Sequence, residues 1–147
     1  VMPDGTALWN QNILASSGGP QTQLQPLAEQ EFQEIQRRLT TYTGSSSATL
    51  TIRNKTVIIV DDGIATGYTI KAAILWLKSL SPAGIILAVP VAPPEILTEL
   101  AALTDRLICP LQPLDFQAVG QYYQDFSQTT DSEVINILRK TKKPNSS

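Results

Sequence analysis

The chain has 147 residues, of which 42% are hydrophobic and 16% charged, and its formal net charge at pH 7 is −2. This composition suits one globular domain, and its few, scattered basic residues argue against a nucleic-acid surface. No apolar run reaches membrane-spanning length. The chain has no histidine, which excludes Ser-His or Cys-His catalysis within it. Its single cysteine, Cys109, cannot form an internal disulfide, and this favours a cytoplasmic location.

The first 51 residues predict a turn, a helix and a loop. Asp4-Gly5 is a turn signal, which predicts a hairpin over residues 1–14. From Pro26 onward, apolar side chains recur at helical spacing: Phe32, Ile35, Leu39 and Tyr42. Residues 40–51 carry no charge and consist largely of Ser and Thr, which predicts a flexible loop.

Strands and helices alternate along the next part of the chain. Continuous apolar runs predict strands over residues 56–60, 85–89 and 106–111, of the kind that is covered on both faces in parallel sheets. Helical patterns over residues 66–80 and from Pro93 onward separate these strands. This order predicts an α/β fold with a parallel sheet and right-handed crossovers.

The C-terminal region contains a helix start signal. Thr130 and Glu133 form the capping-box pattern T-x-x-E, which predicts a last helix. The residues after Lys140 are polar. We therefore expect a single domain over residues 1–140 and a polar tail over residues 141–147.

Two acids, Asp61 and Asp62, directly follow the first predicted parallel strand. Ligands of open α/β sheets bind beyond the carboxyl ends of the strands. The turn over residues 65–69 is built mainly from small residues, so its amides and the following helix N-terminus suit an anion such as phosphate. Carboxylates would repel that anion but accept hydrogen bonds from hydroxyl groups. A sugar phosphate matches both the acid pair and the turn, because it has hydroxyl groups and a phosphate. The sequence does not match the P-loop motif or the dinucleotide-binding motif. The simpler alternative is a tight turn whose acids only end the strand.

The string VIIVDDGIATGYT resembles the phosphoribosyl-pyrophosphate (PRPP) motif of type I phosphoribosyltransferases. The strings QEIQRRLTTY, VAPPE and FQAVGQYYQDFSQTTDSEV extend the resemblance over most of the chain, to bacterial predicted phosphoribosyltransferases. It implies the Rossmann-like type I phosphoribosyltransferase fold, with helices on both faces of the sheet, here with an added N-terminal hairpin. It also implies that Asp61 and Asp62 bind the ribose hydroxyls. Mg²⁺ would accompany the pyrophosphate near these two acids, and no direct protein ligand of the metal is expected. The turn residues implied to hold the 5′-phosphate are Ala65, Thr66, Gly67, Tyr68 and Thr69.

The sequence departs from this family in its N-terminal part. The pyrophosphate loop of these relatives, which reads like L-P-R-G-G, has no match before Asp61. Residues 16–20, SSGGP, have the glycines without the arginine and resemble an ordinary loop. We therefore expect a chain that is truncated before the first βα unit and that has no transferase activity by itself. Residues 40–51 are the expected lid, and basic residues lie only at its edges: Arg37, Arg38, Arg53 and Lys55. For Arg37 and Arg38, the favoured interpretation is that they are solvent-exposed charges on a helix.

The acceptor base is not identified by the sequence, which also assigns no catalytic residue. Family members that act on 6-oxopurines have an aspartate where this chain has Ala65, which argues against hypoxanthine and guanine. Four C-terminal aromatic residues either stack on a planar base or, as the favoured interpretation, complete a core or a subunit contact. These residues are Phe116, Tyr122, Tyr123 and Phe126.

Two kinds of function stay open. The first is an enzyme that transfers phosphoribosyl from PRPP to a nitrogenous base and releases pyrophosphate. The alternative is a non-catalytic module that senses PRPP or a nucleotide, or an accessory domain of a larger polypeptide. We expect a homodimer, with no nucleic-acid or membrane partner.

Overall fold

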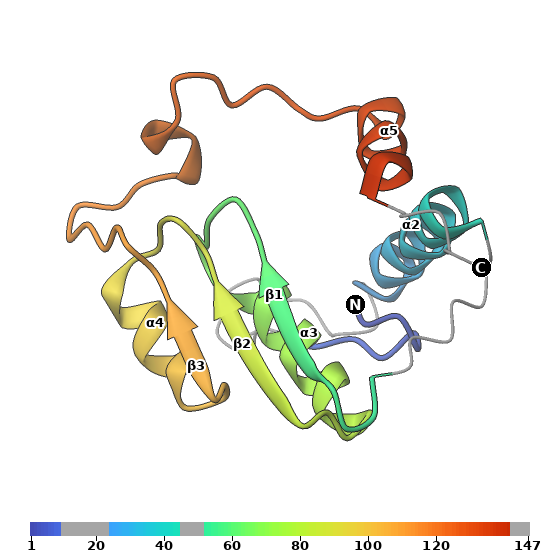
Figure 1. The fold of residues 1–147 in the computed structure, drawn as a ribbon, viewed down its shortest axis with the longest axis horizontal. Coiled ribbons are helices and arrows are strands. Elements are labelled where there is room, and N and C mark those ends of the chain that lie inside the picture. The colour runs from blue at the N-terminus through green and yellow to red at the C-terminus, as the bar shows by residue number, and fades with distance from the viewer. Residues whose placement is uncertain (10–23, 45–51, 142–147) are drawn as a thin grey trace.

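The computed structural model describes residues 1–9, 24–44 and 52–141. Its centre is a three-stranded parallel sheet in the order β1-β2-β3 (Figure 1). The strands are β1 (Thr56–Val60), β2 (Gly84–Ala88) and β3 (Arg106–Ile108). The helix α3 (Tyr68–Ser79) connects β1 to β2, and α4 (Pro94–Ala101) connects β2 to β3. The predicted parallel α/β fold is thus confirmed.

One face of this sheet carries the core. Alternate residues of β2, Ile85 and Leu87, are 2% and 0% exposed and lie in one cluster with the apolar faces of α3 and α4. The strand order β1-β2-β3 means that each helix connects a strand to the next strand on the same side. Two right-handed crossovers in the same direction place both helices on the same face of the sheet. The helix residues of the cluster are Ile70, Ile74, Leu77, Leu97 and Leu100.

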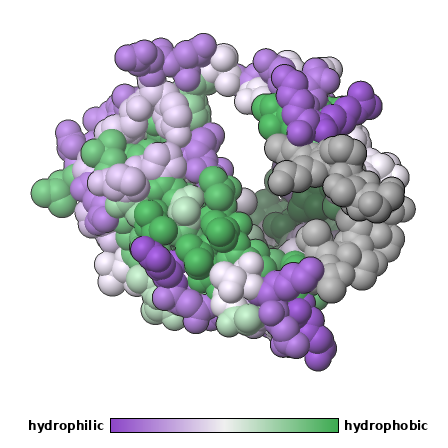
Figure 2. Space-filling view, viewed as in Figure 1, coloured by the Kyte–Doolittle hydropathy of each residue, from purple (hydrophilic) through white to green (hydrophobic). Residues whose placement is uncertain are grey.

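The opposite face of the sheet is not covered by the described residues. Ile58 and Val60 of β1 are 61% and 73% exposed, and hydrophobic residues gather over this side of the molecule in Figure 2. The prediction of helices on both faces, and of a β1 buried on both sides, is therefore wrong for the described part of the chain. The apolar run could not reveal this, because it shows which residues tolerate burial and not what packs on them.

The N-terminal segment forms the predicted turn but no strand. The Met2 amide donates to the Thr6 carbonyl at 2.7 Å and the Gly5 amide donates to the Met2 carbonyl at 2.9 Å. Gly5 adopts φ +86°, which suits glycine in a tight turn. Residues 6–9 are not in a strand, and the rest of the predicted hairpin lies outside the described residues.

The helix α2 (Gln25–Thr43) ends later than the sequence predicts. Residues 40–43, expected in the loop, are helical, in line with the helical spacing of apolar residues that extends to Tyr42. The Thr40 hydroxyl donates to the Gln36 carbonyl one turn earlier at 2.9 Å, as is common for threonine within a helix. Gly44 ends the helix at φ +76°, and its amide donates to the Thr40 carbonyl. The remainder of the expected lid lies outside the described residues. No helix in the described ranges is long and apolar enough to cross a membrane.

The C-terminal helix α5 (Asp131–Thr141) packs against α2, away from the sheet (Figure 1). The predicted capping box forms, since the Thr130 amide donates to Glu133 at 2.8 Å and the Glu133 amide to the Thr130 hydroxyl at 3.3 Å. Asp131 then joins the two helices. It accepts hydrogen bonds from Arg37 at 2.8 Å and from the Tyr42 hydroxyl at 2.6 Å.

Asp131→Asn is expected to loosen α5 from α2. Hydrogen bonds from Arg37 and then Tyr42 lower the pKa of Asp131 below its ordinary value of 3.8. A lowered acid pKa stabilises the fold above the ordinary value, and that stabilisation is lost as the pH falls through the lowered pKa. Hydrogen-exchange protection of the α5 amides should fall in the variant at neutral pH, and in the unmodified protein only below about pH 4. The exposed Asp115, which has no side-chain partner among the described residues, gives the control Asp115→Asn.

Candidate functional site

The acid pair lies at the carboxyl end of β1, as predicted. Both Asp61 and Asp62 are exposed, and the Asp62 amide donates to the Asp61 carboxylate at 3.0 Å. The pKa of Asp61 is raised above its ordinary value, mainly by partial burial and to a smaller extent by the charge of Asp62. The hydrogen bond from the Asp62 amide acts in the opposite direction and lowers this pKa. Neither carboxylate accepts a hydrogen bond from another side chain in the described residues. Both therefore keep lone pairs for a ligand.

The two residues after the acids anchor this loop in the core. The side chain of Ile64 is 2% exposed, and its amide donates to the Val91 carbonyl at 3.0 Å. Gly63 allows the backbone to pass close to two valines. A Cβ at Gly63 would lie 2.7 Å from Cγ1 of Val119 and 2.9 Å from Cγ1 of Val91. The position of the acids thus depends on the short helix η2 (Val119–Tyr122) as well as on the sheet.

The small-residue turn leads from these anchors into α3. Gly67 is the N-cap residue, with φ +73°, a left-handed conformation that favours glycine. The amides of residues 65–70 donate no hydrogen bond within the described residues. Such a group of unused amides at a helix N-terminus is suited to an anion.

A cavity of about 150 Å³ brings one acid and the turn together. Asp61 lines it together with four of the five predicted phosphate-binding residues: Ala65, Thr66, Gly67 and Thr69. The side chain of Tyr68, the fifth, lies instead in a small hollow beside α4, with Lys71 and Glu99. Tyr68 therefore contributes only its backbone amide to the group of unused amides at the start of α3.

Sequence reasoning missed the contact that Tyr123 makes with the acid pair. Its hydroxyl donates to the backbone carbonyl of Asp62 at 2.6 Å. The four predicted aromatic residues form two pairs: Phe116 stacks on Tyr122 at 5.7 Å between ring centroids, and Tyr123 lies against Phe126 at 5.2 Å. The aromatic string was the available signal, but its spacing along the chain did not indicate a contact with the loop after β1.

Tyr123→Phe is expected to weaken ribose 5-phosphate binding about fivefold, because a neutral hydrogen bond contributes about 1 kcal/mol. The lost donor leaves the Asp62 carbonyl without this contact, so the loop is held less firmly. Calorimetric titration measures the change. Tyr122→Phe is the matched control, since the Tyr122 hydroxyl has no hydrogen-bond partner in the described part of the chain. Equal affinities for the two variants would contradict the positioning role of Tyr123.

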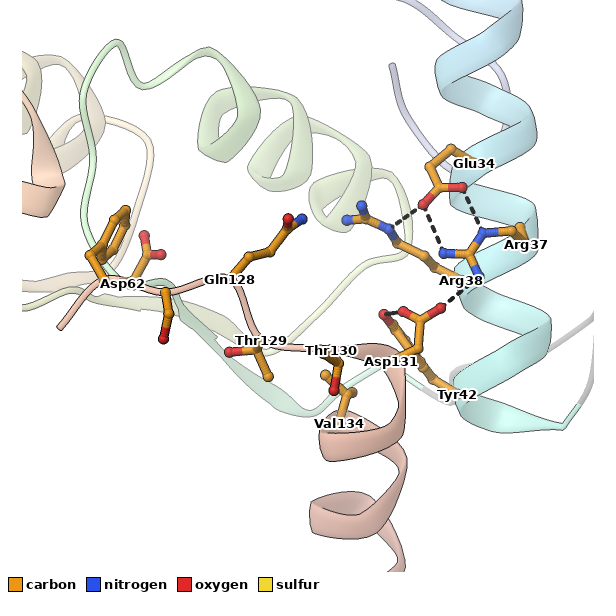
Figure 3. Close-up of a pocket in the computed structure, with 12 residues that line it drawn as sticks. Glu34, Arg37, Arg38, Tyr42, Asp62, Gln128, Thr129, Thr130, Asp131 and Val134 are labelled. Carbon is orange, nitrogen blue, oxygen red and sulfur yellow. Dashed lines mark hydrogen bonds and ion pairs between the residues drawn. The ribbon is translucent and has the colours of Figure 1, made fainter.

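A second cavity, of about 720 Å³, is lined by Asp62 but not by Asp61 (Figure 3). Asp62 lies at one end of it, while residues of α2, residues 126–131 and Val134 form the rest of its wall. Figure 3 shows Arg37, Arg38 and Glu34 projecting from α2 toward this cavity. The predicted solvated charges of α2 are therefore arranged around a cavity and linked to one another.

The fold and this loop define a class of protein: a parallel α/β domain with two acids and an amide-rich turn after its first strand. A family model described as "Phosphoribosyl transferase domain" matches residues 13–127. The chain belongs to this family of phosphoribosyl transferase domains, in agreement with its type I resemblance.

Similar proteins support this membership. Two proteins of Mycobacterium tuberculosis, "Putative phosphoribosyl transferase MT0597" and "Putative phosphoribosyl transferase Rv0571c", are each 33% identical over 135 residues, which cover 92% of this chain and 30% of theirs. The crystal structure of TT1426 from Thermus thermophilus is similar with a TM-score of 0.70 and 31% identity, over 94% of this chain and 64% of that one. The chain thus spans under a third of the two curated relatives and under two thirds of the solved structure.

Proposed function

We propose that this chain binds the ribose 5-phosphate part of PRPP, in a protein that transfers the phosphoribosyl group to a nitrogenous base. The observation that carries the proposal is the shared cavity. Asp61, an acceptor for hydroxyl groups, lines the same cavity as the turn whose amides have no other acceptor in the described residues. A sugar phosphate needs both kinds of group.

Each half of the ligand would contact groups of the matching polarity. The amides of residues 65–69 and the N-terminus of α3 would donate hydrogen bonds to the 5′-phosphate. The carboxylates of Asp61 and Asp62 would accept hydrogen bonds from the ribose hydroxyls. This arrangement separates the acids from the phosphate by the buried Ile64, so that like charges are not brought into contact.

In the transfer itself, the bond between C1 of the ribose and a pyrophosphate oxygen breaks, and its electron pair leaves with pyrophosphate. A nitrogen of the base forms the new bond to C1, and a proton that it carries, as in a purine or pyrimidine, is released. The transition state has oxocarbenium character. The main contributions that the protein can make are orientation of the ribose and stabilisation of the developing charge.

The carboxylates also fit the expected Mg²⁺. No three His, Cys, Asp or Glu side chains in the described ranges are placed to hold a metal by themselves. Mg²⁺ is commonly bound by one or two carboxylates together with substrate phosphates and water, and the exposed Asp61 and Asp62 are suited to that role. When bound with PRPP, Mg²⁺ would neutralise charge on the pyrophosphate.

The test is pyrophosphate release by the full protein that carries this chain. The protein is incubated with PRPP, Mg²⁺ and a panel of purine, pyrimidine and pyridine bases, and each base is omitted in turn. We expect release that depends on one base and on Mg²⁺. PRPP binding without release would favour the sensing module instead, and no binding of PRPP or ribose 5-phosphate would refute the proposal.

A further inference from the structure

The larger cavity contains an arginine whose binding capacity is only partly used. Arg37 is engaged on three nitrogens: Nε and Nη2 donate to Glu34 at 2.7 and 3.0 Å, and Nη1 donates to Asp131 at 2.8 Å. Arg38 donates only from Nε, to Glu34 at 2.7 Å. Its two terminal nitrogens have no acceptor in the part of the chain that the structure describes.

The pairing with Glu34 holds the Arg38 guanidinium in place. Glu34 is itself fixed by both arginines, which lower its pKa to about 2, so it stays ionised at neutral pH. With Nε occupied, the Nη side of the guanidinium projects into the cavity (Figure 3). Gln128, whose side-chain amide has no partner among the described residues, points toward it from the opposite wall. A planar guanidinium with two unused nitrogens matches a group with two anionic oxygens.

The two acids locate this arginine relative to the proposed ligand. Asp61 lines the small cavity with the phosphate turn, whereas Asp62 lines the large cavity with Arg38. A ribose that spans both acids, with its 5′-phosphate in the small cavity, directs its other end toward the large one. The groups attached to or attacking C1 therefore enter the cavity that contains Arg38.

We propose that Arg38 binds an anionic oxygen group of the substrates in the cavity between α2 and residues 126–131. This inference rests on the proposed function, because it places the ribose on Asp61 and Asp62. The group is either the pyrophosphate of PRPP or a carboxylate on the acceptor base. Both present paired oxygens to a guanidinium, and binding measurements distinguish them.

The experiment compares the unmodified full protein with Arg38→Gln by calorimetry in the presence of Mg²⁺. The ligands are ribose 5-phosphate, PRPP, orotidine 5′-monophosphate and uridine 5′-monophosphate; the last two differ only by a carboxylate. The control is Arg53→Gln, which removes the same charge from an exposed arginine that lines neither cavity. Unchanged ribose 5-phosphate affinity in Arg38→Gln shows that the variant is folded.

We expect Arg38→Gln to lose roughly tenfold or more in one comparison, since a hydrogen bond to a charged group is involved. A loss confined to PRPP assigns Arg38 to the pyrophosphate. A loss confined to orotidine 5′-monophosphate relative to uridine 5′-monophosphate assigns it to an acceptor carboxylate. If the unmodified protein binds ribose 5-phosphate and neither comparison changes in the variant, the Arg38 proposal is overturned while the proposed function stands. If the unmodified protein binds no ribose 5-phosphate, the proposed function fails and the Arg38 assignment fails with it.

Discussion

Replacing both Asp61 and Asp62 with Asn is expected to weaken ribose 5-phosphate binding by roughly a hundredfold or more, because hydrogen bonds to a charged acceptor contribute about 1.5–3 kcal/mol each. An amide oxygen accepts from a hydroxyl more weakly than a carboxylate does. The side chains keep nearly the same size, so the loop after β1 should keep its path. Calorimetric titration of the full protein measures the loss.

The same double substitution should not destabilise the fold. Partial burial, and to a smaller extent the charge of Asp62, raise the pKa of Asp61 above its ordinary 3.8. An acid with a raised pKa in the folded state lowers stability as the pH rises through that pKa, so removing the charge should leave Tm at pH 7 unchanged or higher. The control Glu95→Gln with Asp115→Asn removes two charges at positions outside both cavities. Full affinity in the Asn variant, together with full affinity in this control, would remove the acids from the binding site.

Gly67→Ala is expected to lower the free energy of unfolding by about 2–5 kcal/mol and to abolish anion binding at the turn. The left-handed backbone, with φ +73°, costs a residue with a Cβ about 1–2 kcal/mol. The new Cβ would also lie 2.7 Å from Cγ2 of Ile96 on α4, and overpacking of this kind costs about 1–3 kcal/mol. Relief of the clash moves α3 away from α4 and displaces the amides at the start of α3.

Gly44 provides a matched control for the backbone part of this effect. Its φ is +76°, close to that of Gly67, but a Cβ there would have no neighbour within 4 Å among the residues that the structure describes. Gly44→Ala should therefore cost only the backbone contribution, about 1–2 kcal/mol. Denaturant unfolding of both variants separates the two causes. Equal losses of stability would show that the contact between Gly67 and Ile96 does not matter.

The sequence predicted the fold best where local signals decide the structure. The bounds of β1 were predicted correctly, and the helices α2, α4 and α5 begin at or within one residue of their proline and capping signals. The start of α3 was predicted two residues early, because Gly67 takes a left-handed N-cap conformation that no pattern of apolar residues reveals. The strand β3 ends at Ile108, earlier than predicted, before Pro110, which has no amide for a ladder hydrogen bond.

The candidate site follows the same division. Asp61, Asp62 and the turn over residues 65–69 are close together in the chain, so their shared position at the end of β1 could be predicted from the strand and its known binding edge. Tyr123 is 61 residues away from Asp62 in sequence, and its hydrogen bond depends on how η2 packs on Gly63. The role proposed for Arg38 depends on which of its nitrogens Glu34 occupies. A helical repeat indicates that the pair forms but not which donors stay unused.

A crystal structure of the protein with ribose 5-phosphate would show directly whether the loop after β1 binds this ligand. We expect the phosphate on the amides of residues 65–69, at the start of α3, with the ribose hydroxyls within hydrogen-bond distance of the Asp61 and Asp62 carboxylates. A well-ordered ribose 5-phosphate bound elsewhere, with this turn empty, would contradict it.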